Sequence, residues 1–187
     1  MSVTIPIAAA NYSLEGKSTN MKALIEKLYG ILIDTGNSLQ SPLLLLVRLY
    51  WGWQLAQTGW GKITNIDKVV GFFTDLGIPA PWLNAHFVSG VELFGGILLA
   101  IGLMSRPIAF VLTINMLVAY ITADREALGS IFSDPGKFYG ATPYTFLFAS
   151  LLVLIFGPGK FSLDALLAKR WGRVDSIPAT ASATAGY

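Results

Sequence analysis

The chain is predicted to be an all-α integral membrane protein, a four-helix bundle with amphipathic surface helices at its N- and C-terminal ends. Two observations predict this class. Hydrophobic residues make up 53% of the 187 residues and charged residues only 13%, a composition too apolar for a soluble domain that must cover its own surface. The apolar residues also gather into four runs of helical length, and the first two are long enough to span a bilayer. This length supports one compact bundle rather than two domains.

Several classes of function are excluded by residues that the sequence lacks. It contains no cysteine, so disulfides, CxxC redox chemistry, thiolate metal sites and iron–sulfur ligation are impossible. His86 is the single histidine, which rules out bis-histidine haem ligation within one chain. No phosphate-binding loop, nucleophile triad or metal-ligand spacing is present, and a net charge of +2 is too small to indicate nucleic acid. We therefore expect no metal, no covalently bound cofactor and no nucleic-acid partner.

Two segments precede the first predicted span. Residues 1–20 show no sustained periodicity and lack the charged region and apolar core of a secretory signal, so they are expected to remain as a flexible N-terminus. Residues 21–40 are predicted to form an amphipathic helix. Its apolar stripe comprises Leu24, Ile25, Leu28, Ile31 and Leu32, and its polar side carries Lys22, Glu26 and Lys27. This pattern is typical of a helix on the membrane surface, and a helix packed on a neighbouring soluble subunit is the open alternative.

A membrane domain is predicted over residues 41–159. Its four spans are expected at about residues 42–61, 82–103, 107–122 and 142–157. Ser41 and Pro42 supply the N-cap and first-turn proline of the first span. Ser105-Arg106-Pro107 forces a tight turn between the second and third spans. The fourth span ends at Gly157-Pro158-Gly159.

The segments outside the spans are expected to lie at the two membrane surfaces. Loop 62–81 contains an apolar stretch that Gly77 and Pro79 end, and together with loop 123–141 it is predicted to cover the outer mouth of the bundle. An amphipathic helix is predicted over residues 160–173 and a disordered tail over 174–187. Eight basic residues lie on the side of the termini and four on the other side. The positive-inside rule then places both termini in the cytoplasm, at a bacterial-type inner membrane.

Arg48 and Glu92 lie inside the first two predicted spans. One ionisable residue at that depth costs about 3 kcal/mol, so each is expected to be paired or functional. The spacings Gly52-x-x-x-Ala56 and Gly96-x-x-x-Ala100 let the two helices approach closely, and we expect Arg48 and Glu92 to meet. The pair would either fix helix packing or line a pocket for a polar head group, such as a quinone carbonyl or an anion. A proton-carrying role for Glu92 is a further alternative.

A second set of polar residues is expected nearer the outer side. Its members are Gln54, Gln57, Lys62, His86, Asn115, Tyr120 and Asp124. A lone histidine at a helix start is more often an interfacial residue than a ligand, and Lys62 is more often a snorkelling anchor than part of a site. Gln57, Lys62, His86 and Asp124 nevertheless join Arg48 and Glu92 as the candidate polar site in the membrane.

The order RLYWGWQLAQTGWGKI, FFTDLGIP and SGVELFGGILLAIGLMSRP resembles the DoxX family of small four-helix membrane proteins, over about residues 43–157. The resemblance carries over Arg48, Gly61, Lys62, Gly77, Pro79, Glu92, Gly96, Gly102 and Arg106. It implies a membrane component of redox systems, since similar proteins include a subunit of thiosulfate:quinone oxidoreductase and partners in oxidative-stress complexes, while more distant relatives serve in cargo export. The absence of cysteine argues against a thiol relay in this chain.

These observations predict a membrane subunit or anchor of a redox complex rather than a self-sufficient enzyme. Its candidate ligand is a quinone or a lipid, and its expected partners are the bilayer and other membrane or redox subunits. Electrons would come from a partner's cofactor. The alternatives are a non-catalytic structural subunit of a larger assembly, and a small carrier or channel with a polar path from Glu92 past Gln57 to His86.

Overall fold

The computed structural model describes residues 7–170, with side chains from residue 21 onward. The chain divides into two units at Gln40 and Ser41, and the membrane domain belongs to the second. The predicted tail at 174–187, and the end of the helix predicted over 160–173, lie outside the described residues.

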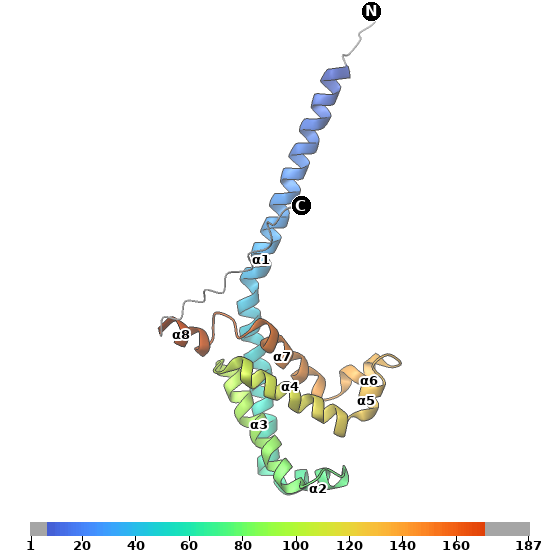
Figure 1. Ribbon diagram of the computed structural model, residues 1–187, viewed down its shortest axis with the longest axis vertical. Helices are drawn as coiled ribbons and strands as arrows, with labels where there is room; N and C mark the ends of the chain where they lie inside the picture. The colour runs from blue at the N-terminus through green and yellow to red at the C-terminus, as the bar shows by residue number, and fades with distance from the viewer. Residues whose placement is uncertain (1–6, 171–187) are drawn as a thin grey trace, which may run out of the picture. The chain divides into compact units, whose positions relative to one another are not determined.

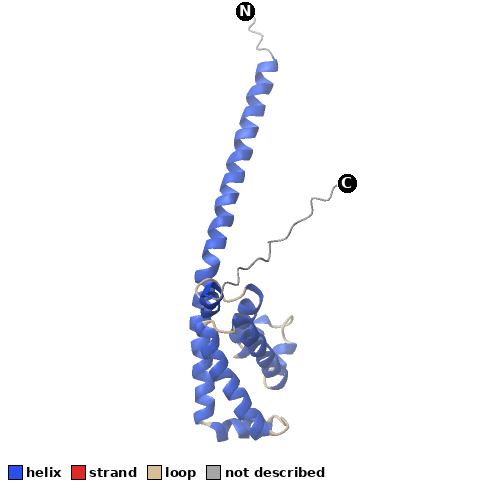
Figure 2. Cartoon of the chain, turned by 60° about the vertical axis from the view of Figure 1, so that its left-hand side comes forward, coloured by secondary structure: helices blue, strands red, loops and turns tan. Residues whose placement is uncertain are grey.

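The described residues form helices and no strands, which confirms the all-α fold class (Figure 1). The helices are α1 (Ile7–Thr64), α2 (Ile66–Asp75), α3 (Pro81–Ile101), α4 (Ser105–Thr122), α5 (Arg125–Gly129), α6 (Pro135–Gly140), α7 (Pro143–Phe156) and α8 (Leu163–Arg170). Within the second unit, α1 and α3 run side by side, and α4 pairs with α7 and crosses them obliquely (Figures 1 and 2).

Two described helices, α3 and α4, are long and apolar enough to cross a membrane, and α7 is apolar but shorter. The segment of α1 over residues 42–61 falls outside this set, because Arg48, Gln54 and Gln57 lower its hydropathy. Large apolar side chains nevertheless cover the outer faces of all four helices. They include Leu46 and Trp53 on α1, Phe94 and Ile97 on α3, Phe110 and Ile114 on α4, and Phe148 and Ile155 on α7. A surface of this kind is compatible with insertion into a membrane.

Helix α1 starts earlier and ends later than the predicted elements that it contains. It begins at Ile7, within the segment predicted to be flexible, and it continues through Pro42, where the sequence predicts a new helix. The alanines at positions 8–10 favour helix strongly. Proline inside a helix removes one backbone hydrogen bond. Here the helix continues before and after Pro42 despite the missing bond.

The contact between α1 and α3 depends on residues without large side chains. A Cβ atom added to Gly52 would lie 2.8 Å from the carbonyl oxygen of Gly96 and 2.9 Å from the backbone nitrogen of Ala100. A Cβ atom on Gly96 would in turn lie 2.5 Å from the backbone nitrogen of Ala56. The two small-residue pairs therefore pack against each other, as the sequence predicts. Gly59, on the same face of α1 as Gly52, makes an even closer contact with the backbone of Leu93.

Two glycines end helices in the left-handed conformation. Gly77 follows α2 with φ 70°, and Ile78 N–H donates to the Phe73 carbonyl at 3.0 Å. Gly102 follows α3 with φ 73°, and Leu103 N–H donates to the Leu98 carbonyl at 3.0 Å. Both endings are Schellman-type caps, for which glycine is the favoured residue. Gly102 leads into the short turn before α4 and thereby fixes the end of the bundle at which Arg48 lies.

Candidate functional site

Three helices of the second unit bring polar side chains together around Glu92. Its Oε1 atom accepts hydrogen bonds from Lys62 Nζ of α1 at 2.6 Å and from Asn115 Nδ2 of α4 at 3.4 Å. Its Oε2 atom is buried and has no hydrogen-bond partner among the residues that the structure describes. We call Lys62, Glu92 and Asn115 the Glu92 cluster.

The register of α1 against α3 produces this cluster. Gly59 packs on Ser89 and Leu93, so Lys62, one turn further along α1, lies within side-chain reach of Glu92. The Glu92 side chain is 5% exposed, whereas that of Lys62 is 31% exposed. Lysine therefore reaches the buried carboxylate along its aliphatic stem while part of it stays at the surface.

The free oxygen determines what the cluster can do chemically. A buried acceptor without a donor typically costs 1–3 kcal/mol. Glu92 Oε2 can therefore accept a hydrogen bond from a hydroxyl group of a bound molecule, or it can take up a proton. Lys62 and Asn115 are N–H donors that suit a carbonyl oxygen. The cluster thus combines donors and a free acceptor within otherwise apolar helices.

Arg48 does not meet Glu92, so the predicted pairing is wrong. Arg48 is fully buried, and its Nη2 atom donates to the Phe161 carbonyl at 2.6 Å. Within the described part of the chain, its Nε and Nη1 atoms have no partner. The cause is the register between the helices, because Gly52 lies opposite Gly96 and Ala100. Arg48 is consequently level with Gly102, and Glu92 lies ten residues, about 15 Å, away along α3. An arginine side chain cannot bridge that separation.

Instead, Arg48 contacts the turn between α3 and α4 and the segment that precedes α8. Its guanidinium lies against Gly102, where an added Cβ atom would collide with Nη1 and would also lie 2.7 Å from Ser162 Cβ. Asp164 of α8 accepts hydrogen bonds from the backbone N–H groups of Met104 and Ser105, both at 2.8 Å, and so caps α4. Its own N–H donates to the Gly102 carbonyl at 2.9 Å. We call Arg48, Gly102 and Asp164 the Arg48 junction.

Sequence reasoning missed the part of this junction that comes from the chain after α7. The carbonyl of Phe161 is a backbone acceptor, which no side-chain pattern can reveal. Asp164 did carry a signal, because an acidic residue in the first turn of a helix commonly interacts with a helix N-terminus. That signal does not show which helix the carboxylate caps.

Other predicted site residues lie apart from the Glu92 cluster. Gln57 is exposed on α1, and exposed His86 interacts through Nδ1 with the Trp82 carbonyl at 2.8 Å. Asp124 is half-buried just before α5, and Tyr120 donates to the Phe138 carbonyl at 2.9 Å. No hydrogen bond joins any of these four to Glu92 in the described part of the chain. The residues predicted for turns or packing also differ in setting, since Gly61 has open space around it, while Arg106 is exposed near Gly157.

The segment 123–141, which the sequence predicts on the outer side, contains an exposed ion pair. Lys137 Nζ lies 2.8 Å from Glu126 Oε2. The hydrogen bond and charge of Lys137 lower the pKa of Glu126, and Glu126 likewise raises the pKa of Lys137. The pair borders a polar pocket of about 440 Å³ that also includes Asp124 and Arg125. This pocket is distinct from the Glu92 cluster.

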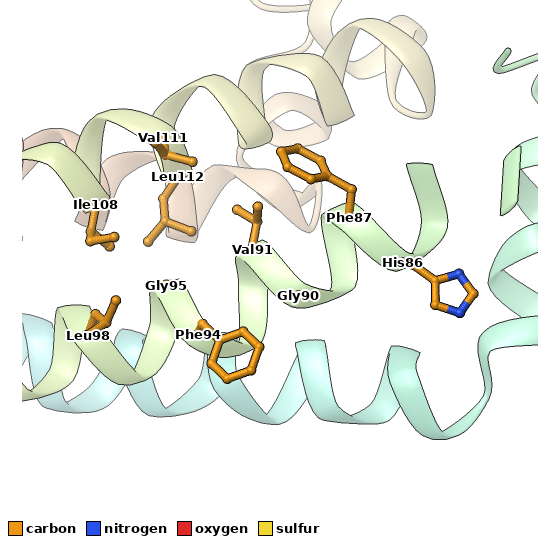
Figure 3. A pocket seen from close by; sticks show the side chains of 10 residues that line it. All are labelled: His86, Phe87, Gly90, Val91, Phe94, Gly95, Leu98, Ile108, Val111 and Leu112. Carbon is orange, nitrogen blue, oxygen red and sulfur yellow. The ribbon is translucent and has the colours of Figure 1, made fainter. Parts of the chain in front are cut away.

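A second, apolar groove of about 390 Å³ lies between α3 and α4 (Figure 3). Val91, Gly95 and Leu98 line it from α3, and Ile108 and Leu112 line it from α4. His86 lies at one end of the row of lining residues, and its ring points away from α4 (Figure 3). The groove is therefore bounded mainly by hydrocarbon.

Comparison with known proteins identifies similar membrane proteins. The DoxX family model matches residues 43–125. The "Uncharacterized membrane protein Rv3486" of Mycobacterium tuberculosis is 31% identical over 141 residues, covering 69% of this chain and 83% of that protein. The "Inner membrane protein YqjF" of Escherichia coli is 29% identical, covering 60% of this chain and 82% of that protein.

A third similar protein has a name that mentions chemistry. The "Putative oxidoreductase CatD" of Bacillus subtilis is 25% identical over 127 residues, covering 67% of this chain and 87% of that protein. No solved structure matches the chain. The segment matched by the family model contains Lys62, Glu92 and Asn115, whereas Asp164 lies beyond it.

Proposed function

Because the chain belongs to the DoxX family of membrane proteins, we propose that it is the membrane subunit of a redox complex and binds a quinone head group at the Glu92 cluster. The observation that carries this proposal is the buried Oε2 atom of Glu92, which has no hydrogen-bond partner within residues 21–170 although the donors Lys62 and Asn115 lie beside it. The name of one similar protein, CatD, agrees with a redox setting.

The cluster has the groups that a quinone and its reduced form require. A quinone ring carries carbonyl oxygens, which can accept hydrogen bonds from Lys62 or Asn115. Reduction of a quinone by two electrons and two protons gives a quinol, whose hydroxyl can donate to Glu92 Oε2. Electrons would come from the redox cofactor of a partner subunit, and this chain would position the ring and hold a proton at Glu92.

The proposal includes a location. We place the protein in a bacterial inner membrane with both termini in the cytoplasm, as its distribution of basic residues favours. The names of two similar Escherichia coli proteins also mention the inner membrane. Lys62 then lies towards the outer surface, and the Arg48 junction lies towards the cytoplasm.

Quinone extraction tests this function. The protein would be purified from its native membranes in a gentle detergent, and bound quinone would be quantified by chromatography. We expect quinone near one equivalent in the wild type and at least about tenfold less in Glu92→Gln, because truncating a hydrogen-bonded charged group in a site costs 2–5 kcal/mol. Glu126→Gln is the matched control, since it removes an exposed carboxylate away from the cluster. Quinone-free wild-type protein, or equal quinone in Glu92→Gln, would refute the proposal.

A purely structural role is the second candidate, and Arg48 favours it. A fully buried arginine that binds a backbone carbonyl and packs on a turn glycine holds helices together and leaves no exposed group for a ligand. This role predicts purification within a larger assembly without quinone. A carrier or channel has less support, because Gln57 and His86 are exposed and make no hydrogen bond with Glu92.

A further inference from the structure

We infer that the groove between α3 and α4 holds the isoprenoid tail of the same ligand whose ring meets the Glu92 cluster. This inference rests on the proposed function and extends it from a head group to a class of molecule, a quinone with a branched hydrocarbon tail. The starting point is continuity, because the two helices that form the groove also supply Glu92 and Asn115.

The groove and the cluster use neighbouring turns of the same two helices. Val91 lines the groove and directly precedes Glu92, which itself does not line it, and the two side chains point about 100° apart around the axis of α3. Leu112 lines it from α4 and precedes Asn115 by three residues, about one helical turn. A molecule with a ring at Glu92 therefore needs to turn around only one side of α3 to place its tail in the groove.

The chemistry of the groove suits a tail and not a second polar ring. Its lining is aliphatic and aromatic except for His86, whose ring points away from α4 (Figure 3). Phe87 and Phe94, which border it, are 64% and 63% exposed, so the groove opens on the apolar outer face of the helices. A hydrocarbon chain can therefore enter it sideways from the bilayer without crossing a polar surface.

Two glycines of α3 shape this space in different ways. A Cβ atom on Gly95 would lie 2.9 Å from Leu112 Cδ2, so Gly95 allows α4 to approach. A Cβ atom on Gly90 would meet nothing within 4 Å, although Gly90 lines the groove. A larger side chain at position 90 therefore fills the groove without a clash at its first carbon. Gly71 of α2 also has open space around it and does not line the groove, which makes it a matched control.

The test compares two quinones that share one ring, one with no tail and one with a tail of two isoprene units. Binding would be measured to protein in phosphatidylcholine nanodiscs, with protein-free nanodiscs correcting for partition into lipid. In the wild type we expect the tailed quinone to bind about fivefold more tightly, because packing against fixed side chains adds dispersion contacts that fluid lipid does not match. Gly90→Leu should abolish that advantage and leave the tail-free quinone unchanged, and Gly71→Leu should change neither.

The outcomes separate the inference from the function on which it rests. If the tail-free quinone binds and the tailed one gains nothing, the groove assignment is overturned while the quinone site stands. If Gly90→Leu weakens both quinones equally, the groove holds the ring and the tail assignment fails. If native mass spectrometry finds a phospholipid that Gly90→Leu removes without affecting either quinone, the groove is a lipid site instead. If neither quinone binds to the wild type, the proposed function fails as well.

Discussion

Arg48 and Glu92 are both buried charges in apolar helices, yet their surroundings differ. Arg48 is fully buried, binds a backbone carbonyl and touches a glycine whose replacement would collide with it. Glu92 is paired with a lysine that is one-third exposed, and one of its oxygens is free. Burial alone therefore does not separate a structural charge from a candidate site. Unpartnered polar atoms do not separate them either, because both side chains keep such atoms among the described residues. The difference is that the partner of Glu92 is a side chain that reaches the surface, whereas the partner of Arg48 is a backbone carbonyl.

The Arg48 junction gives the largest expected effect. In Gly102→Ala, a side chain must adopt a left-handed conformation and displace the Arg48 guanidinium. We expect a loss of about 3–5 kcal/mol, the range for leaving a buried charge without its partner, measured by unfolding in mixed micelles. Gly61→Ala is the control, because open space surrounds Gly61 and alanine favours helix by up to about 1 kcal/mol. Equal stability of the two variants would show that Arg48 does not depend on this turn.

Removing the lysine of the Glu92 cluster should lower the unfolding free energy less than Gly102→Ala does. Lys62→Met leaves the buried carboxylate without its charged donor, and we expect a loss of about 2 kcal/mol, reduced from the buried-pair range because Lys62 is partly exposed. Adding Glu92→Gln in the same chain should recover most of that loss. A double-mutant cycle on unfolding free energies measures this coupling. Strictly additive effects would mean that the two side chains do not interact.

The cap on α4 should have a smaller effect. Asp164→Asn keeps the shape of the side chain and removes the charge at the helix N-terminus, which should cost about 1 kcal/mol. Hydrogen exchange should become faster at the backbone amides of Met104 and Ser105, which donate hydrogen bonds to Asp164. Asp67→Asn, an exposed acid in the first turn of α2, serves as the comparison. Unchanged exchange at these two amides would argue that the carboxylate charge is unimportant there.

The exposed ion pair of Glu126 and Lys137 should have the smallest effect on stability, and this effect should depend on pH. The pKa of Glu126 is lowered, so its contribution is present above its unfolded pKa and is lost as pH falls through the lowered value. The pKa of Lys137 is raised, so its contribution is lost as pH rises through that raised value. In the wild type, NMR titration of the loop should show one transition at acid pH and one at alkaline pH, and the acid transition should be lost in Glu126→Gln. An acid transition that persists in this variant would belong to another group.

Patterns within one helix were predicted better than the alignment between helices. The all-α class followed from composition, and the close approach of α1 and α3 followed from the small-residue spacings at Gly52 and Gly96, each of which is a pattern within one helix. The pairing of Arg48 with Glu92 failed because it required the relative level of two helices, which depends on side-chain volumes at every contact between them. Lys62 and Asn115 were recognised as polar residues near the outer side, but their convergence on Glu92 depended on that same alignment.

The close contact of α1 and α3 has a consequence for motion. Where Gly52 and Gly96 meet, backbone touches backbone, so sliding one helix past the other would drive a neighbouring side chain into a main chain. These two helices should therefore move as one rigid pair, which keeps Lys62 in contact with Glu92. The other hydrogen bond to Glu92, from Asn115 of α4, is longer, at 3.4 Å. Any opening that admits a molecule to the Glu92 carboxylate should therefore come from a hinge motion of α4 about the short turn at Gly102.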